Sequence, residues 1–239
     1  MGIHMRNDLT LVMPVYNEAE CIGPVVAAWL ERLQETVPKF RLLVINDGSR
    51  DGTARALDPF RGRPDVDVVD KANSGHGPTI LMGYRKAVES ADWVFQCDSD
   101  DEIPPDDFPA FWQRRDEADA IIGVRQNRAQ PLARKIISAA SRWTVRAIYR
   151  GGVRDVNCPF RLMRASALAP LLPKLADDTF APNVILSGLF ALHGLRILNL
   201  PVAYRPRRTG TVSLAKFSLW KKAFKAFRQT VGNRWSKPC

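Results

Sequence analysis

The chain has few of the residues that would indicate disulfides, a cysteine-based metal site or a membrane span. It contains four cysteines in 239 residues, and no two of them are close enough in sequence for a metal knuckle or a redox pair. No apolar run approaches the roughly 20 residues that a spanning helix needs. These absences argue against a disulfide-rich secreted domain, favour a reducing, cytoplasmic compartment, and predict that the chain does not cross a membrane by itself.

What the chain does contain is typical of a soluble globular domain. Hydrophobic residues make up 46% of it and charged residues 25%. It shows no internal repeat and no low-complexity linker. We therefore expect one large domain over residues 6–215, followed by a separate C-terminal segment over residues 216–239.

Positive charge is concentrated in two segments. The net charge is +10, and the ten Lys and Arg residues between Arg205 and Cys239, where there is no acid, account for all of that excess. A second block, from Ala120 to Arg154, has eight basic residues and no acid. Such clustering indicates a polyanionic partner, for example anionic lipid, phosphate or nucleic acid.

Strand and helix patterns alternate along the first half. Buried-strand patterns occur at residues 9–15, 40–45, 66–69 and 93–97, and helical patterns at 18–37, 53–57 and 79–90. This alternation predicts an α/β fold with a mostly parallel sheet flanked by helices. In the second half we expect helices at 105–117, 131–149, 166–175 and 182–193, and strands at 120–124, 157–164 and 195–204.

Polar residues follow three of the expected strands directly. They lie at residues 16–18, 46–49 and 98–100. Ligands of such sheets bind beyond the carboxyl ends of the strands, so we expect the three segments to converge on one rim. Asp98 and Asp100 stand one residue apart there, and such carboxylates suit Mg²⁺ or Mn²⁺ that also contacts substrate phosphates.

These segments resemble the signature of family 2 glycosyltransferases, which have the GT-A, Rossmann-like fold. The matching residues are 14–18 (PVYNE), 46–53 (NDGSRDGT) and 98–100 (DSD). Residues 124–128 (VRQNR), Arg134, Asp155, 158–164 (CPFRLMR) and Arg207 resemble the polyprenyl-phosphate branch, which includes dolichyl-phosphate mannose synthases and undecaprenyl-phosphate sugar transferases. One departure is Asn46, where an aspartate is commoner.

The resemblance implies roles for particular residues. Positions that contact the nucleotide sugar are matched by Pro14, Tyr16, Glu18, Asp47 and Asp98. Metal positions are matched by Asp98 and Asp100, with Glu102 as a third ligand, and Asp100 is expected to be catalytic. Phosphate or acceptor positions are matched by Arg125, Arg134 and Arg207, whose guanidinium groups can bind phosphate in a bidentate manner. The base, uracil or guanine, and the sugar are left open.

The resemblance also implies an inverting, metal-dependent transfer from a nucleoside-diphosphate sugar to a polyprenyl phosphate. A lipid monophosphate has a second pKa of roughly 6 and is already an oxyanion at neutral pH, so it needs no general base. Asp155 is the candidate base if one is used, and otherwise it would cap or pair with Arg154 or Arg161. Arg161 and Arg164 are expected on one strand face, as partners of acids or of phosphate.

The C-terminal segment has the pattern of a basic amphipathic helix. Its apolar stripe contains Phe217, Trp220, Phe224 and Phe227, and lysines occupy the other face. This composition favours binding to an anionic membrane surface, although docking on the domain's own core stays open. We expect a peripheral protein at the cytoplasmic face of the membrane, with a possible anchor beyond the segment and possible homo-oligomers.

Two other functions have support in the sequence. A family 2 transferase that acts on a sugar hydroxyl would need a base, for which Asp177 and Asp178 are present without the expected aromatic context. A nucleic-acid-binding protein would explain the basic charge. It would leave the acidic rim unexplained, so we expect no nucleic-acid partner.

Overall fold

The computed structural model describes residues 6–126 and 152–205. Within these ranges, strands form a seven-stranded sheet of order β3-β2-β1-β4-β6-β5-β7. The strands are β1 (Asn7–Val15), β2 (Phe40–Asn46), β3 (Val66–Asp70), β4 (Ala91–Gln96), β5 (Ala120–Arg125), β6 (Arg161–Arg164) and β7 (Ile197–Val202). Strand β6 runs antiparallel to β4 and β5, and the other pairings are parallel. The expected mostly parallel α/β sheet is confirmed.

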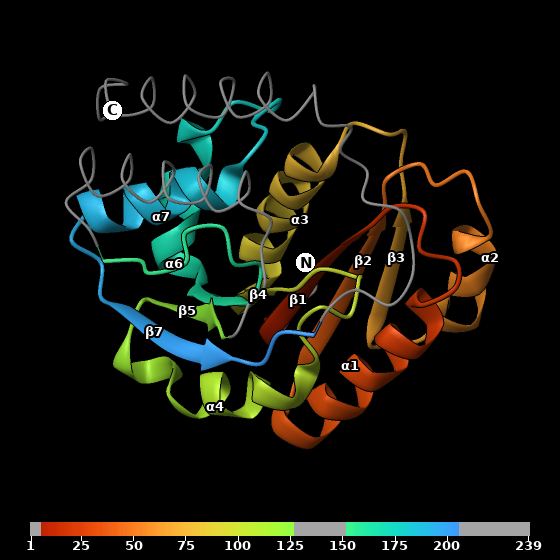
Figure 1. The fold of residues 1–239 in the computed structure, drawn as a ribbon, viewed down its shortest axis with the longest axis horizontal. Coiled ribbons are helices and arrows are strands. Elements are labelled where there is room, and N and C mark those ends of the chain that lie inside the picture. The colour runs from red at the N-terminus through yellow and green to blue at the C-terminus, as the bar shows by residue number, and fades with distance from the viewer. Residues whose placement is uncertain (1–5, 127–151, 206–239) are drawn as a thin grey trace, which may run out of the picture.

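Helices cover both faces of this sheet. They are α1 (Ile22–Thr36), α2 (Thr53–Leu57), α3 (His76–Ser90), α4 (Phe108–Gln113), α6 (Ala165–Leu168) and α7 (Pro182–Leu192). Figure 1 shows α1 and α4 on one face and α3, α6 and α7 on the other. Helix α1 buries side chains at three- and four-residue steps from Ile22 to Leu33, in agreement with the helical pattern expected at residues 18–37.

Several element boundaries differ from those expected. Helix α1 begins four residues late, because residues 16–21 form a loop that bonds to the loop after β2. Strand β6 is shorter than 157–164, since residues before it turn at the bond from Cys158 N to Asp155 O. The helix expected at 105–117 is divided into α4 and two short 3₁₀ helices. The elements at 131–149 and 216–239 lie outside the described residues.

An aromatic cluster joins the two halves of the sheet. The ring of Phe95 on β4 lies 5.4 Å from Trp29 of α1, 4.9 Å from Phe108 of α4 and 4.8 Å from Phe160, between ring centroids. These side chains are almost completely buried. Phe95 packs edge-to-face against Phe108 and Phe160, and such packing adds roughly 0.5–1.5 kcal/mol per pair beyond burial of area. The cluster therefore holds β4, which carries the acidic motif, firmly in the core.

The parallel register brings the polar segments to one edge. Val15 on β1 pairs with Asn46 on β2, Asn46 pairs with Asp70 on β3, and Val12 pairs with Gln96 on β4.

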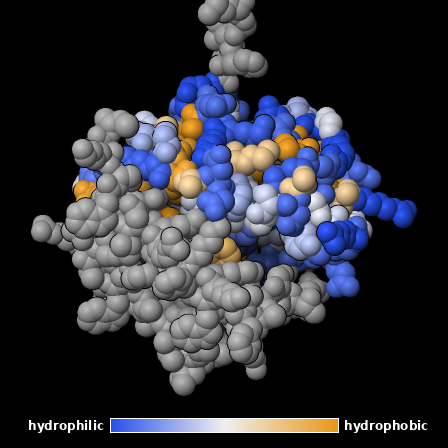
Figure 2. All heavy atoms as spheres, turned by 90° about the horizontal axis from the view of Figure 1, so that it is seen from above, coloured by the Kyte–Doolittle hydropathy of each residue, from blue (hydrophilic) through white to orange (hydrophobic). Residues whose placement is uncertain are grey.

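In the face seen in Figure 2, hydrophilic residues dominate the described surface and apolar ones are scattered among them. Among the described residues, no helix is long and apolar enough to span a membrane.

Candidate active site

The loops after β1 and β2 are fastened to each other by side chains of the sequence motifs. Asn17 N donates to Ser49 Oγ at 3.0 Å, and Arg50 N donates to Asn17 Oδ1 at 2.8 Å. Glu18 N donates to Thr53 Oγ1 at 2.8 Å. Asn17 has a φ of 55°, a left-handed conformation that asparagine tolerates better than most residues. Several side chains of the sequence motifs therefore shape the rim.

Asp51 and Asn46 make further hydrogen bonds within and around the loops that follow β1 and β2. Asp51 accepts hydrogen bonds from Thr53 N at 2.9 Å and from Ala19 N at 3.2 Å. Burial would raise the pKa of Asp51, but the hydrogen bond from the Thr53 hydroxyl, together with these backbone bonds, outweighs it and lowers the pKa below 3.8. Asn46 donates from Nδ2 to Asp70 Oδ1 at 2.8 Å, which an aspartate could not do. The departure from the family pattern at Asn46 thus has a local partner.

Asp47 is buried beneath the loop that precedes α3. Its carboxylate accepts hydrogen bonds from the Lys71 ammonium and from the backbone N–H groups of Ser74 and Gly75, both at 2.9 Å. Gly75 has a φ of 95°, which glycine adopts without strain. The expected nucleoside contact of Asp47 stays a prediction. In the structure the carboxylate orders residues 71–75 at the rim.

The other predicted nucleoside contacts lie close together in sequence but differ in exposure. Pro14 is buried at the end of β1, Tyr16 is 37% exposed, and Glu18 is 8% exposed. The Cys21 thiol lies 3.2 Å from Glu18 Oε2. Tyr16 therefore presents an open ring at the rim, and Glu18 presents a carboxylate held near the start of α1. Their contacts with a nucleotide remain predictions.

The acidic motif follows β4 with one residue, Cys97, between them. Asp98 Oδ1 accepts a hydrogen bond from Gln96 Nε2 at 3.3 Å, and His76 Nε2 at the start of α3 lies 3.7 Å from the same oxygen. Asp100 Oδ1 accepts a bond from the backbone N–H of Glu102 at 3.2 Å. The backbone of Cys97 is fixed by a bond to Val12 O at 3.2 Å. Both carboxylates therefore stand on a short, braced turn.

The predicted third metal ligand, Glu102, has a different environment. Its carboxylate accepts a hydrogen bond from the Tyr204 hydroxyl at 3.3 Å, and its carbonyl oxygen accepts one from Arg205 N at 2.8 Å. In residues 6–126 and 152–205, no three His, Cys, Asp or Glu side chains gather as a metal-binding group. Two carboxylates without a third fit Mg²⁺ or Mn²⁺ that takes its other ligands from water and a diphosphate. Metal ligation by these residues stays a prediction.

On the other side of β4, Arg125 and Asp155 form a closely bonded ion pair. Arg125 Nε lies 2.8 Å from Asp155 Oδ2, and Nη2 lies 2.9 Å from Oδ1. Burial would lower the pKa of Arg125, but the bonds to Asp155 raise it. The sequence predicted Asp155 as a candidate base, or otherwise as a cap or partner of Arg154 or Arg161. In the structure Asp155 pairs with Arg125, and a role as a base stays a prediction. The other predicted phosphate ligands, Arg134 and Arg207, lie outside the described residues.

Arg161 and Arg164 do not share a strand face, because residues three apart on a strand point in opposite directions. Arg161 is fully buried and donates to the carbonyl oxygens of Cys158, Val156 and Asn183 at 2.7–3.2 Å. Arg164 stacks over the Trp93 ring at 4.3 Å. It also lies 3.6 Å from Asp116 Oδ1 and 3.9 Å from Asp119 Oδ1. Arg161 is therefore a structural residue of the core.

Lys71 was missed by the sequence reasoning, although it follows β3 at the same rim. A rule that polar residues after every parallel strand belong to the site would have found it.

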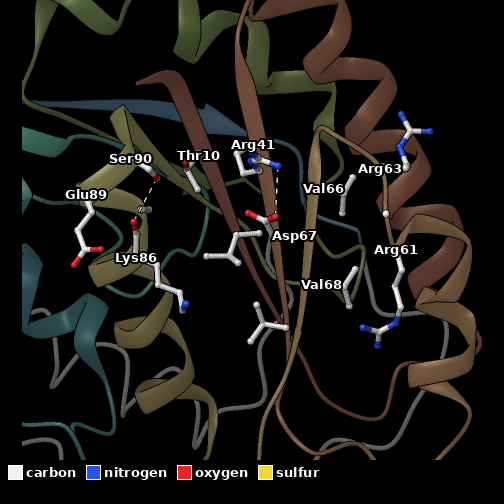
Figure 3. Close-up of a pocket in the computed structure, with 14 residues that line it drawn as sticks. Thr10, Arg41, Arg61, Arg63, Val66, Asp67, Val68, Lys86, Glu89 and Ser90 are labelled. Carbon is white, nitrogen blue, oxygen red and sulfur yellow. Dashed lines mark hydrogen bonds and ion pairs between the residues drawn. The ribbon is translucent and has the colours of Figure 1, made fainter. Parts of the chain in front are cut away.

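A pocket of about 600 Å³ lies elsewhere, between the sheet and the end of α3 (Figure 3). It is lined by early strand residues such as Thr10 and Arg41 and by Lys86, so it is separate from the rim.

Comparison with known proteins agrees with this fold and identifies the family. Residues 10–169 match the model of glycosyl transferase family 2. The match covers well over half of the chain, which therefore belongs to that family, as its motifs predicted. The expected recognition and enzyme class are confirmed.

Curated relatives narrow the resemblance. The chain is 27% identical over 218 residues to the undecaprenyl-phosphate 4-deoxy-4-formamido-L-arabinose transferases of Pectobacterium atrosepticum and Pectobacterium carotovorum. The match covers 90% of this chain and 64% of each relative, so the chain spans somewhat less than two thirds of their length.

Solved structures support the fold. Glucosyl-3-phosphoglycerate synthase from Mycobacterium tuberculosis, crystallised with Mn²⁺, uridine diphosphate and phosphoglyceric acid, superposes with a TM-score of 0.71. The two proteins are 15% identical, and the match covers 96% of this chain and 79% of the other. A likeness at this identity confirms the GT-A-type fold alone.

Proposed function

We propose that this protein transfers a sugar from a nucleoside-diphosphate sugar to a polyprenyl phosphate, with a divalent cation at Asp98 and Asp100. The observation that carries the proposal is the match to undecaprenyl-phosphate sugar transferases over 90% of the chain. The rim geometry supports it, because the proposed donor carboxylates follow β1, β2 and β4, and Arg125 ends β5, on the other side of β4 from β1 and β2.

On the donor side, the residues of this chain would bind and orient the nucleotide. Tyr16 would stack on the base, and Glu18 and Asp47 would accept hydrogen bonds from base or ribose donors. For Asp47 this requires its carboxylate to exchange or share the bonds now made by residues 71–75. A cation held by Asp98 and Asp100 would neutralise charge on the departing diphosphate. The choice between Mg²⁺ and Mn²⁺ is part of the test.

On the acceptor side, a phosphate monoester supplies its own nucleophilic oxygen at neutral pH. Asp155 therefore need not remove a proton, and both of its oxygens are already bonded to Arg125. We propose that Asp155 orients the Arg125 guanidinium, whose remaining N–H groups would face the phosphate. Arg134 and Arg207 would add positive charge.

Transfer to a sugar hydroxyl receives less support. That reaction needs a base, and the pair Asp177-Asp178 was the sequence candidate. Asp177 Oδ1 instead lies 2.6 Å from Arg85 Nη1, in an exposed ion pair.

We further propose that the protein works peripherally at the cytoplasmic face of the membrane, where it would contact anionic lipids and its lipid acceptor. Homo-oligomers belong to the same proposal.

The test is a donor screen with undecaprenyl phosphate as acceptor, in which UDP- and GDP-sugars are compared with Mg²⁺, Mn²⁺ or chelator. Product is measured as labelled lipid. We expect one donor class to be used, no transfer in chelator, and a loss of at least about a hundredfold for Asp100→Asn.

Asp92→Asn is the matched control, because Asp92 lies at the opposite end of β4 and pairs with Arg6 on the surface. It should transfer sugar like the wild type. Full activity of Asp100→Asn, or of the wild type in chelator, would contradict the metal site. Transfer to a sugar hydroxyl, with none to the lipid phosphate, would contradict the acceptor.

A further inference from the structure

A chain of buried polar side chains runs from the core to Asp98. Gln96 Nε2 donates to Asp98 Oδ1 at 3.3 Å, and the Tyr84 hydroxyl lies 2.5 Å from Gln96 Oε1. The same hydroxyl lies 2.9 Å from the side chain of Asn183. The three residues come from β4, α3 and α7, and they are at most 4% exposed. Elements far apart in sequence thus meet directly behind the acidic motif.

The chemistry of these groups sets the direction of the bonds. An ionised carboxylate only accepts, so Gln96 must turn its NH₂ toward Asp98 and its carbonyl oxygen toward Tyr84. Tyr84 has one proton, and it therefore goes to Gln96. The Asn183 amide completes the chain with its nitrogen toward the Tyr84 oxygen, an orientation reached by rotating the amide by 180°. Each member fixes the rotamer of the next.

The far end of the chain is anchored as well. The backbone carbonyl of Asn183 accepts hydrogen bonds from Arg161 Nη1 at 3.2 Å and from Ser187 Oγ at 2.7 Å. Arg161 is fully buried, so its position and that of Asn183 are fixed by the core. The hydrogen-bonded chain therefore fixes the position of Asp98 Oδ1 relative to the core, through Asn183, Tyr84 and Gln96.

The strand itself does not need these polar groups. Gln96 already pairs through its backbone with Val12 on β1 and Arg161 on β6. A leucine of similar volume at position 96 would bury apolar surface with no cost of removing an amide from water. A buried glutamine that ends on a rim carboxylate therefore indicates a role in positioning that carboxylate.

We infer that Tyr84 and Gln96 are positioning residues for Asp98, which hold its Oδ1 so that Oδ2 is presented to the cation and diphosphate of the donor. This inference rests on the proposed function, because it assumes that Asp98 takes part in donor binding. Partners of this kind typically change metal affinity by about 10- to 100-fold when they are removed.

The experiment measures Mn²⁺ affinity of the full chain by electron paramagnetic resonance of free Mn²⁺, with UDP and, in parallel, GDP. Tyr84→Phe and Gln96→Leu should each weaken binding about tenfold, which corresponds to about 1.4 kcal/mol. Once Gln96 is leucine, adding Tyr84→Phe should weaken binding by less than about twofold, since Tyr84 acts through Gln96. At saturating Mn²⁺, kcat of Tyr84→Phe should return to within about threefold of wild type.

Thr10→Val is the matched control. It also removes a buried hydroxyl, on the neighbouring strand β1, and Thr10 Oγ1 has no hydrogen-bond partner among the described residues. It should leave Mn²⁺ affinity unchanged. Thermal melting of every variant checks folding, and Tyr84→Phe, which deletes one oxygen atom, serves if Gln96→Leu is unstable.

The outcomes separate this inference from the proposed function. If Asp98→Asn abolishes Mn²⁺ binding while Tyr84→Phe and Gln96→Leu bind like wild type, the positioning role is refuted and the donor site stands. Independent, multiplicative effects of the two substitutions would refute the order of the chain. If wild type binds no Mn²⁺ with either nucleotide, or Asp98→Asn binds equally well, the proposed metal site fails and the inference fails with it.

Discussion

Replacing Asp155 by asparagine distinguishes a structural partner from a catalytic base. In the structure both carboxylate oxygens of Asp155 accept hydrogen bonds from Arg125, at 2.8 and 2.9 Å. The side chain of Arg125 is 6% exposed and that of Asp155 is 23% exposed, so solvent screens the pair only partly. Asp155→Asn keeps the shape of the side chain but leaves a buried guanidinium without its counter-charge.

The expected loss of stability follows from this burial. Removing one partner of a buried ion pair costs about 3–5 kcal/mol, and the asparagine oxygen can retain one of the two bonds, so we expect about 3 kcal/mol. Replacing both partners by apolar residues, as in Arg125→Met with Asp155→Leu, should recover much of that loss. The coupling energy of the two sites should then be about 2 kcal/mol or more.

Urea unfolding followed by circular dichroism gives the free energies, provided that the slope with urea stays constant between variants. Sugar transfer to the lipid acceptor is measured on the same preparations. A pure general base predicts the opposite pattern, namely unchanged stability with transfer abolished. An unchanged free energy of unfolding in Asp155→Asn would therefore refute the structural reasoning, whatever happens to activity.

Three further predictions follow from local contacts. Gly77→Ala should cost about 3 kcal/mol, because its Cβ would lie 2.1 Å from the Thr179 carbonyl oxygen. In thermal melting it is compared with Gly23→Ala, whose Cβ would meet nothing within 4 Å and which should gain about 0.5–1 kcal/mol. Thr53→Val should cost about 1 kcal/mol in urea, and an unchanged midpoint would contradict the fastening of the rim loops. Because the pKa of Asp51 is lowered below 3.8 in the fold, its stabilisation should be present above pH 4 and lost in more acid solution. Asp51→Asn should flatten that acid loss in circular dichroism.

The sequence predicted the strands and the rim because each buried apolar run ends in polar residues. The β1, β2 and β4 runs, for example, end within one or two residues of the expected positions. The predicted element boundaries were wrong where long-range hydrogen bonds compete with the local sequence pattern, as at the start of α1. The spacing of hydrophobic residues indicates which face of a helix is buried. It does not indicate whether the first residues of the pattern belong to the helix or to the loop before it.

Partners across the fold were harder to predict than positions. Arg125 and Asp155 were both selected, yet the bond between them was not, because charge pattern alone allowed Arg154 and Arg161 equally well. Tyr84 and Asn183 are 99 residues apart and read as ordinary helix residues in sequence. Such contacts depend on how α3 and α7 pack on the sheet, which a local pattern cannot specify.

Residues 46–53, the second of the three sequence motifs, act together in the structure. Asn46, Ser49, Asp51 and Thr53 bond to one another, to the β1 loop and to the end of β3. Two backbone loops held at a fixed spacing form a rigid rim, and rigid placement is what the proposed nucleotide binding would require before any ligand contact is made. Most side chains of this motif therefore build the rim, and Asp47, which orders residues 71–75, connects it to the start of α3.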